Sequence, residues 1–158
     1  MKRSITTLSL GIVLSFGISA QDLPKPSPMA KVEQRVGLTD LTITYSRPGV
    51  KNRTIWGDLV PYGKLWRAGA NKATLFTTTS DIIIGDQTLP EGEYSLFILP
   101  KKEGAWEVVF NNETELWGTG KYNQEDDQLR IMATPQKMKD TPERMEFHFI
   151  DVDMNNAT

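Results

Sequence analysis

The stretch that decides the fold is EYSLFILPKKEGAWEVVFN, residues 93–111. In residues 93–99, large apolar side chains occupy both faces of an extended chain, which is typical of a fully buried strand. Pro100 ends this strand, residues 101–104 form a charged turn, and residues 105–111 return. The aligned apolar side chains are Tyr94, Leu96 and Ile98 in the first half, and Trp106, Val108 and Phe110 in the second. The stretch predicts a central antiparallel hairpin.

Short alternating segments surround this hairpin, and almost no helical periodicity occurs. Further strands are predicted at 30–36, 41–46, 74–80, 81–84, 128–133 and 145–150, with 81–84 of the buried type. Turn signals separate these strands, and residues 54–60 have room for one helical or 3₁₀ turn. We therefore predict an all-β fold of about eight or nine strands, an antiparallel β-sandwich or a jelly-roll-like arrangement with one long irregular loop.

The N-terminus has the pattern of a secretory signal peptide at residues 1–20. Lys2 and Arg3 precede an apolar run over residues 5–18, and Ala20 supplies a small residue for cleavage. The run is short for a transmembrane helix and glycine and serine interrupt it, so we favour cleavage over a retained anchor and expect no membrane span afterwards. A proline-rich linker at 21–28 and a single β domain at 29–158 follow.

Composition excludes several classes of protein. The chain has 158 residues and a formal net charge of −2, which suits one soluble domain and argues against a nucleic-acid-binding surface. It has no cysteine, so it has no disulfide, thiol nucleophile or thiolate metal site. The oligomeric state is left open by the sequence.

Catalytic chemistry finds little support in the residues. With His148 as the only histidine, a serine triad and a multi-histidine zinc site are both disfavoured, and we read His148 as an ordinary strand residue. Acidic candidates lie in turn, edge or terminal contexts where solvated charge is expected: Glu91, Glu93, Asp126, Asp127, Asp151 and Asp153. We therefore predict no catalytic residue, no metal and no cofactor, and lean against an enzyme.

The candidate site is the polar, aromatic stretch between residues 44 and 74. Its possible ligand-binding residues are Tyr45, Arg47, Arg53, Trp66, Arg67 and Asn71. In one interpretation Arg47 and Arg67 bind a carboxylate, phosphate or sulfate, or Tyr45, Trp66 and Asn71 bind a sugar. In the other, which we favour, the guanidinium groups bond carbonyls of the long loop, Asn71 makes an Asx-type turn, and Trp56 and Trp66 close the open end of the sandwich.

The same stretch resembles a known family. The similarity rests on Tyr45-Ser46-Arg47-Pro48, Ile55-Trp56-Gly57, Leu59-Val60-Pro61-Tyr62-Gly63 and Trp66-Arg67-Ala68-Gly69-Ala70-Asn71, with Trp117-Gly118, Tyr122 and Leu129-Arg130 further on. These motifs resemble the bacterial domain-of-unknown-function family 2911 from about residue 26 onward. The resemblance implies an exported, mainly β protein of the periplasm or exterior of a Gram-negative bacterium, with no established activity.

One departure from the family and three functional hypotheses remain. Similar chains usually continue beyond Thr158 with another apolar strand, so we expect a truncated sequence to lack a final strand and to expose an edge prone to aggregation.

The leading hypothesis is an exported non-catalytic domain that binds a small anion or a glycan. The alternatives are a hydrolase of polysaccharide or another envelope polymer, and a structural or interaction module of the cell envelope.

Overall fold

The computed structural model describes residues 23–158, and the predicted signal peptide at 1–20 lies outside them. The elements are β1 (Met29–Val36), β2 (Thr39–Ser46), β3 (Thr74–Thr78), β4 (Ile82–Ile84), β5 (Gln87–Leu89), β6 (Gly92–Leu99), β7 (Trp106–Asn111), the 3₁₀ turn η1 (Gln124–Asp126) and β8 (Asp127–Ala133). The all-β prediction is confirmed, with eight strands in the described part. No helix there is long and apolar enough to cross a membrane.

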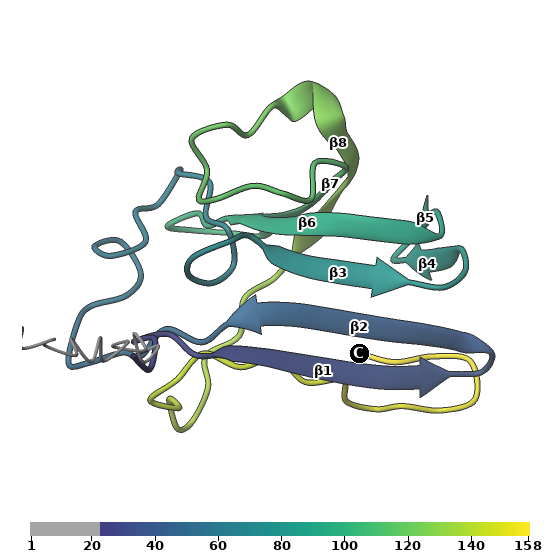
Figure 1. Cartoon of the computed structure of the whole chain (residues 1–158), viewed down its shortest axis with the longest axis horizontal. Helices are drawn as coiled ribbons and strands as arrows, with labels where there is room; N and C mark the ends of the chain where they lie inside the picture. The colour runs from purple at the N-terminus through teal and green to yellow at the C-terminus, as the bar shows by residue number, and fades with distance from the viewer. Residues whose placement is uncertain (1–22) are drawn as a thin grey trace, which may run out of the picture.

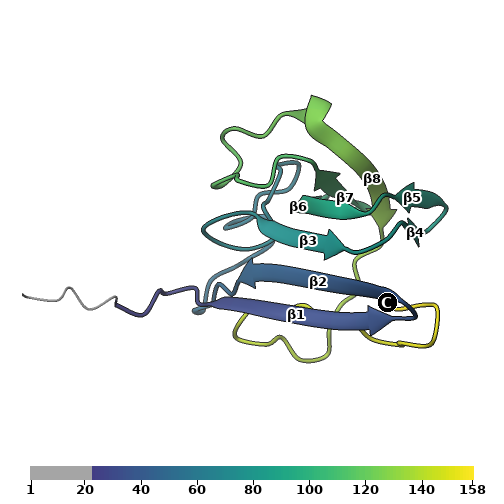
Figure 2. The same cartoon turned by 45° about the vertical axis from the view of Figure 1, so that its right-hand side comes forward.

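Six strands form one open antiparallel sheet in the order β1-β2-β3-β6-β7-β8, and β4 pairs with β5 in a separate hairpin (Figure 1). The central hairpin predicted from residues 93–111 is β6–β7, in which Leu96 lies opposite Phe110. The sheet does not close, so β1 and β8 are its two edges (Figure 2). A long loop joins β2 to β3 across residues 47–73.

Each face of the sheet carries its own apolar cluster. The face that bears Tyr94 and Leu96 packs against the β4–β5 hairpin and against Phe147 and Phe149 near the C-terminus, and we call it the hairpin face. The opposite face is covered by loop residues, so we call it the loop face; its cluster is Ala73, Phe97, Val109 and Leu116, with Leu65 and Tyr122 packed against it. Cover on both faces gives the layered arrangement of a sandwich.

The predicted strand at 145–150 is wrong, although its alternation is real. Phe147 and Phe149 point inward and their neighbours are exposed, yet the segment forms no ladder with the sheet. Its backbone pairings lie at its two ends and outside the sheet: Met145 N donates to Pro48 O at 3.0 Å, and Ile150 and Thr158 exchange hydrogen bonds of 2.6 and 2.8 Å. A side chain of β2 holds the segment instead of a strand ladder: the Tyr45 hydroxyl accepts a hydrogen bond from the Phe147 amide at 3.1 Å. Figures 1 and 2 show this yellow segment running beside β1 and β2.

Two smaller expectations also change. The segment 81–84 was predicted to be a buried strand, but Ile83 is 75% exposed because β4 lies in a two-stranded hairpin with only one face on the sheet. Residues 54–60 form a turn rather than a helix. Its amides reach back five residues, with Val60 N donating to Ile55 O at 2.8 Å, and Gly57 and Pro61 prevent its extension.

Candidate functional site

The β2–β3 loop turns sharply in several places, and the aromatic residues of the loop fill the space that the turns create. Gly57 has φ of +87°, and a Cβ at that position would lie 2.7 Å from the ring of Tyr62, so only glycine fits. Trp56 packs edge-on against Trp66 at 5.5 Å and against Trp106 of β7 at 4.6 Å. These rings anchor the loop to the central hairpin.

Two of the predicted arginines bond the protein's own backbone. Arg47 Nε donates to Met145 O at 2.9 Å, and its Nη2 pairs with the Glu146 carboxylate at 3.1 Å. Arg53 donates from Nη2 to Gly49 O at 2.5 Å and from Nε to Val50 O at 3.1 Å. Both therefore act as clips, Arg47 on the C-terminal segment and Arg53 within the loop itself.

Three other predicted residues are also engaged within the fold. Tyr45 is buried on the hairpin face, where its ring packs edge-on against Phe147 at 4.9 Å. Asn71 Nδ2 donates to Ser46 Oγ at 3.2 Å and to Ser27 O at 3.4 Å, which ties the end of the loop to β2 and to the predicted linker. Trp66 forms an antiparallel bridge with Ile98 of β6.

Arg67 differs from all of these. Its Nε is buried and makes no hydrogen bond with any residue that the structure describes. Burial lowers the pKa of Arg67, and no neighbouring carboxylate opposes that effect. The antiparallel bridge between Trp66 and Ile98 places Arg67 opposite Phe97, on the loop face. Among residues 23–158, this partly buried cation thus has no hydrogen-bond partner for its Nε.

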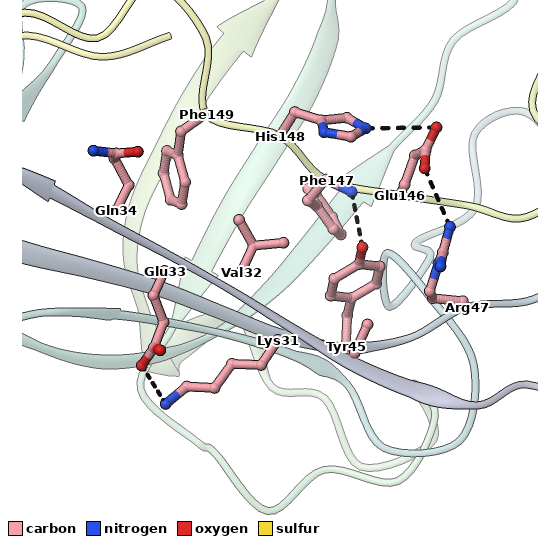
Figure 3. Close-up of a pocket in the computed structure, with 11 residues that line it drawn as sticks. Lys31, Val32, Glu33, Gln34, Tyr45, Arg47, Glu146, Phe147, His148 and Phe149 are labelled. Atoms are coloured by element: carbon pink, nitrogen blue, oxygen red, sulfur yellow. Dashed lines mark hydrogen bonds and ion pairs between the residues drawn. The ribbon is translucent and has the colours of Figure 1, made fainter.

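A groove of about 360 Å³ lies elsewhere, along the β1 edge (Figure 3). Residues 30–34 of β1 line one side and residues 146–149 line the other. Tyr45 and Arg47 reach this groove, whereas the other four predicted site residues do not line it. At its rim Glu146 joins Arg47 to His148, whose Nε2 lies 3.5 Å from the Glu146 carboxylate. The six residues predicted to form one site therefore do not converge on one cavity.

A polar network on the loop face was missed by the sequence reasoning. Arg130 of β8 contacts the Asp127 carboxylate at 2.8 Å, the Glu107 carboxylate at 2.8 Å and the Tyr122 hydroxyl at 2.6 Å. Asn111 Nδ2 donates to the other oxygen of Asp127 at 2.8 Å. Asp127 was expected to be solvated, but its side chain is only 7% exposed because these donors surround it. The family resemblance had included Tyr122 and Arg130, and that was the one available signal.

Burial and the hydrogen bond to Asp127 raise the pKa of Tyr122 to about 12. Tyr122 therefore stays protonated as a donor at neutral pH and is not poised to act as a base. Glu107 shifts the other way, since the hydrogen bond from Lys101 and the contact with Arg130 hold its pKa below the ordinary value. Structural ion-pair networks also shift pKa values, and here Arg130 bonds Asp127, Glu107 and Tyr122 together, so we read the cluster as structural.

Glu107 gives a pH prediction. Because its folded-state pKa lies below the unfolded value of 4.5, its contribution is full above pH 4.5 and is lost as the pH falls through the folded value. We expect Glu107→Gln to be less stable than the wild type at pH 7, and this difference to be smaller at pH 3. Urea unfolding at both pH values measures the two differences. An unchanged difference at pH 3 would contradict the ion-pair role of Glu107.

The structure therefore defines a class, an open antiparallel β domain with one long loop fastened by arginines and tryptophans. The chain belongs to the family described as Protein of unknown function (DUF2911), whose family model covers residues 27–158. No curated protein and no solved structure gives a significant match. The family description assigns no activity, so the function has to be argued from the residues.

Proposed function

We propose that this protein is an exported, non-catalytic β domain that binds a small oxyanion, a carboxylate, phosphate or sulfate, at Arg67. The observation that carries the proposal is the buried Nε of Arg67, which has no partner among residues 23–158. The signal-like residues 1–20 support export to the periplasm or the exterior. The same loop that holds Arg67 also carries the motifs of the family.

The chemistry of a guanidinium explains why an oxyanion is the expected ligand. A buried cationic nitrogen without a partner is costly, and native structures rarely retain one without a bound water or ion. A planar guanidinium presents two parallel N–H groups, which match two oxygens of a carboxylate, phosphate or sulfate. Arg47 and Arg53 each direct Nε and Nη2 at protein oxygens, so Arg67 is the loop arginine whose Nε remains for an anion.

The glycan alternative has less support than the anion. It required Tyr45, Trp66 and Asn71 to face a sugar together. Tyr45 is only 4% exposed and its hydroxyl bonds Phe147, while the amide of Asn71 is held by Ser46. An anion site needs none of these side chains to be free.

The hydrolase alternative also has less support. Asp127 and Glu107 are close in space, but both pair with the same Arg130. A glycosidase instead needs one carboxyl group with a raised pKa to act as the acid. The pKa of Glu107 is lowered, so it does not meet this requirement.

Anion titration of Arg67→Met tests the proposal. For the wild type we expect phosphate, sulfate or acetate to raise the free energy of unfolding by about 2.7 kcal/mol at an anion concentration near 100 times Kd. Chloride at the same ionic strength serves as the reference, since it removes general screening effects. Arg67→Met should lose the anion response without losing stability in chloride, because the Nε of Arg67 makes no bond in the fold.

Arg53→Met is the matched control. It removes the same charge from the same loop but breaks bonds to Gly49 O and Val50 O. We expect it to be less stable than the wild type and to keep the full anion response. Equal anion responses in wild type and Arg67→Met, or no response in the wild type, would refute an Arg67 site. A loss of stability in Arg67→Met in chloride would indicate a structural clip instead.

A further inference from the structure

The outer edge of β1 presents backbone groups in a regular row. Val36 and Thr39 flank the two-residue turn between β1 and β2, so they form a hydrogen-bonded pair. Just before β1, Arg47 N donates to Pro28 O at 2.9 Å, so residue 28 also bonds toward β2. Hydrogen-bonded pairs alternate along the strand, so the even-numbered residues of β1 bond to β2. The odd-numbered residues direct their N–H and C=O groups away from the sheet: Met29, Lys31, Glu33 and Arg35.

Each edge of the sheet has one backbone carbonyl that a side chain covers. At the β8 edge the side chain of Gln87, from β5, donates to the carbonyl of Arg130 at 3.3 Å. At the β1 edge one carbonyl is covered, that of Arg35, by the side chain of the adjacent Gln34 at 2.8 Å. The outward groups of Lys31 and Glu33 find no hydrogen-bond partner in the part of the chain described. Unpaired strand edges of this kind are templates for another strand.

We propose that β1 pairs in antiparallel orientation with β1 of a second copy, with Val32 opposite Val32 at the two-fold axis. In this register Lys31 lies opposite Glu33 of the second copy, and Glu33 lies opposite its Lys31. Both are outward-bonding residues, so each of these two central pairs exchanges two backbone hydrogen bonds, and Met29 lies opposite Arg35 of the other copy at each end. Lys31 and Glu33 already pair with each other at 2.5 Å within one copy, so in the dimer the four side chains form one cluster of alternating charge, with two further lysine–glutamate pairs across the interface. The contact is isologous, as expected for a closed dimer.

Charge selects this register over its neighbours. Outward groups meet only when odd-numbered residues face odd-numbered residues, so the register shifts in steps of two. Centring on Lys31 places Lys31 opposite Lys31, and centring on Glu33 places Glu33 opposite Glu33, which is destabilising in both cases. Centring on Gln34 leaves only two outward pairs within β1, Glu33 opposite Arg35 in both directions, and both use the Arg35 carbonyl, which the Gln34 side chain already covers. Edge strands that avoid pairing often carry charged side chains. On β1 the charges alternate in sign along the strand, so an antiparallel second copy centred on Val32 presents the opposite charge to Lys31 and to Glu33.

The groove beside β1 supplies apolar contact for the same pairing. Residues directly opposite in an antiparallel pair point to the same face, so Val32 of the second copy would enter the groove next to Val32. Figure 3 shows Val32 directed toward the side on which Phe147 and Phe149 lie, and Lys31 and Glu33 directed to the other side. The side chain from the second copy would therefore bury apolar surface against Phe147 and Phe149.

Charge-reversal variants examined by sedimentation equilibrium test the dimer and its register. We expect the wild type to dimerise and Lys31→Glu and Glu33→Lys each to raise the dissociation constant at least about 10-fold, since each turns both attractive pairs into repulsive ones. An equimolar mixture of the two variants should form a heterodimer at least as tight as the wild-type dimer, because every opposed pair is then complementary. The double variant Lys31→Glu/Glu33→Lys should dimerise like the wild type.

The matched controls are Lys102→Glu and Glu103→Lys, which make the same charge changes at exposed residues of the β6–β7 turn. Both should dimerise like the wild type, and far-ultraviolet circular dichroism of every variant checks that the fold is kept. A wild type that remains monomeric at the highest concentration examined would overturn the proposal. Variants at residues 31 and 33 that dimerise like the wild type, or a mixture that fails to associate, would also overturn it.

Discussion

Phe97→Ala is expected to lower the free energy of unfolding by about 3–5 kcal/mol. Phe97 has no exposed surface and lies on β6, at the centre of the cluster on the loop face. Its ring packs edge-on against Tyr122 at 5.2 Å, and truncation leaves a cavity that the sheet cannot fill by moving, because β6 is paired on both sides. Chemical denaturation with guanidinium chloride measures the change.

Ile83→Ala is the control for Phe97→Ala. Ile83 is also a large apolar strand residue, but it is 75% exposed on the β4–β5 hairpin. Its truncation should change the free energy of unfolding by no more than about 0.5 kcal/mol. If the two substitutions had similar effects, the loop face would not be a second core.

Asp127→Ala is the other substitution with a large expected effect, about 1–3 kcal/mol, because it leaves buried donors without an acceptor while Arg130 keeps Glu107. It removes the acceptor for Arg130 Nε, for the Tyr122 hydroxyl and for the Asn111 amide. Because the Asp127 side chain is only 7% exposed, water cannot freely take its place. Urea unfolding at pH 7 gives the loss of stability.

A spectroscopic measurement separates this network from a general packing defect. The hydrogen bond to Asp127 is the second cause, after burial, of the Tyr122 pKa of about 12. Asp127→Ala should therefore lower the Tyr122 pKa, which an ultraviolet titration of tyrosinate detects. Asp126→Ala is the control, since Asp126 is the exposed neighbour and should leave both stability and titration unchanged. An unshifted tyrosine titration in Asp127→Ala would contradict the role of Asp127.

The local sequence pattern predicted well those strands whose two faces are both covered by other parts of the protein. The alternation in residues 93–111 identified the β6–β7 hairpin and its two faces, because periodicity reports directly on which side is buried. The same rule failed at 145–150, where alternation correctly indicated an extended chain but could not reveal what it pairs with. Periodicity describes a segment, whereas strand pairing depends on residues distant in sequence.

For the site, the sequence identified the kinds of residue involved but not their partners. Arg47 bonds a carbonyl 98 residues away, and no local signal encodes such a contact. The Asp127–Arg130 pair was missed because the acidic residue was read in its turn context, where solvation is the rule. Arg67 is distinguished from Arg47 and Arg53 only by its lack of partners, a property that no sequence motif expresses.

The bond between Tyr45 and Phe147 has a consequence for how the chain is made. It joins residues 102 positions apart, and the β1–β2 hairpin is complete by residue 46. During synthesis, which runs from the N-terminus, the apolar side of this first hairpin stays uncovered until Phe147 and Phe149 have been added. This contact therefore cannot form during synthesis until residue 149 has been added.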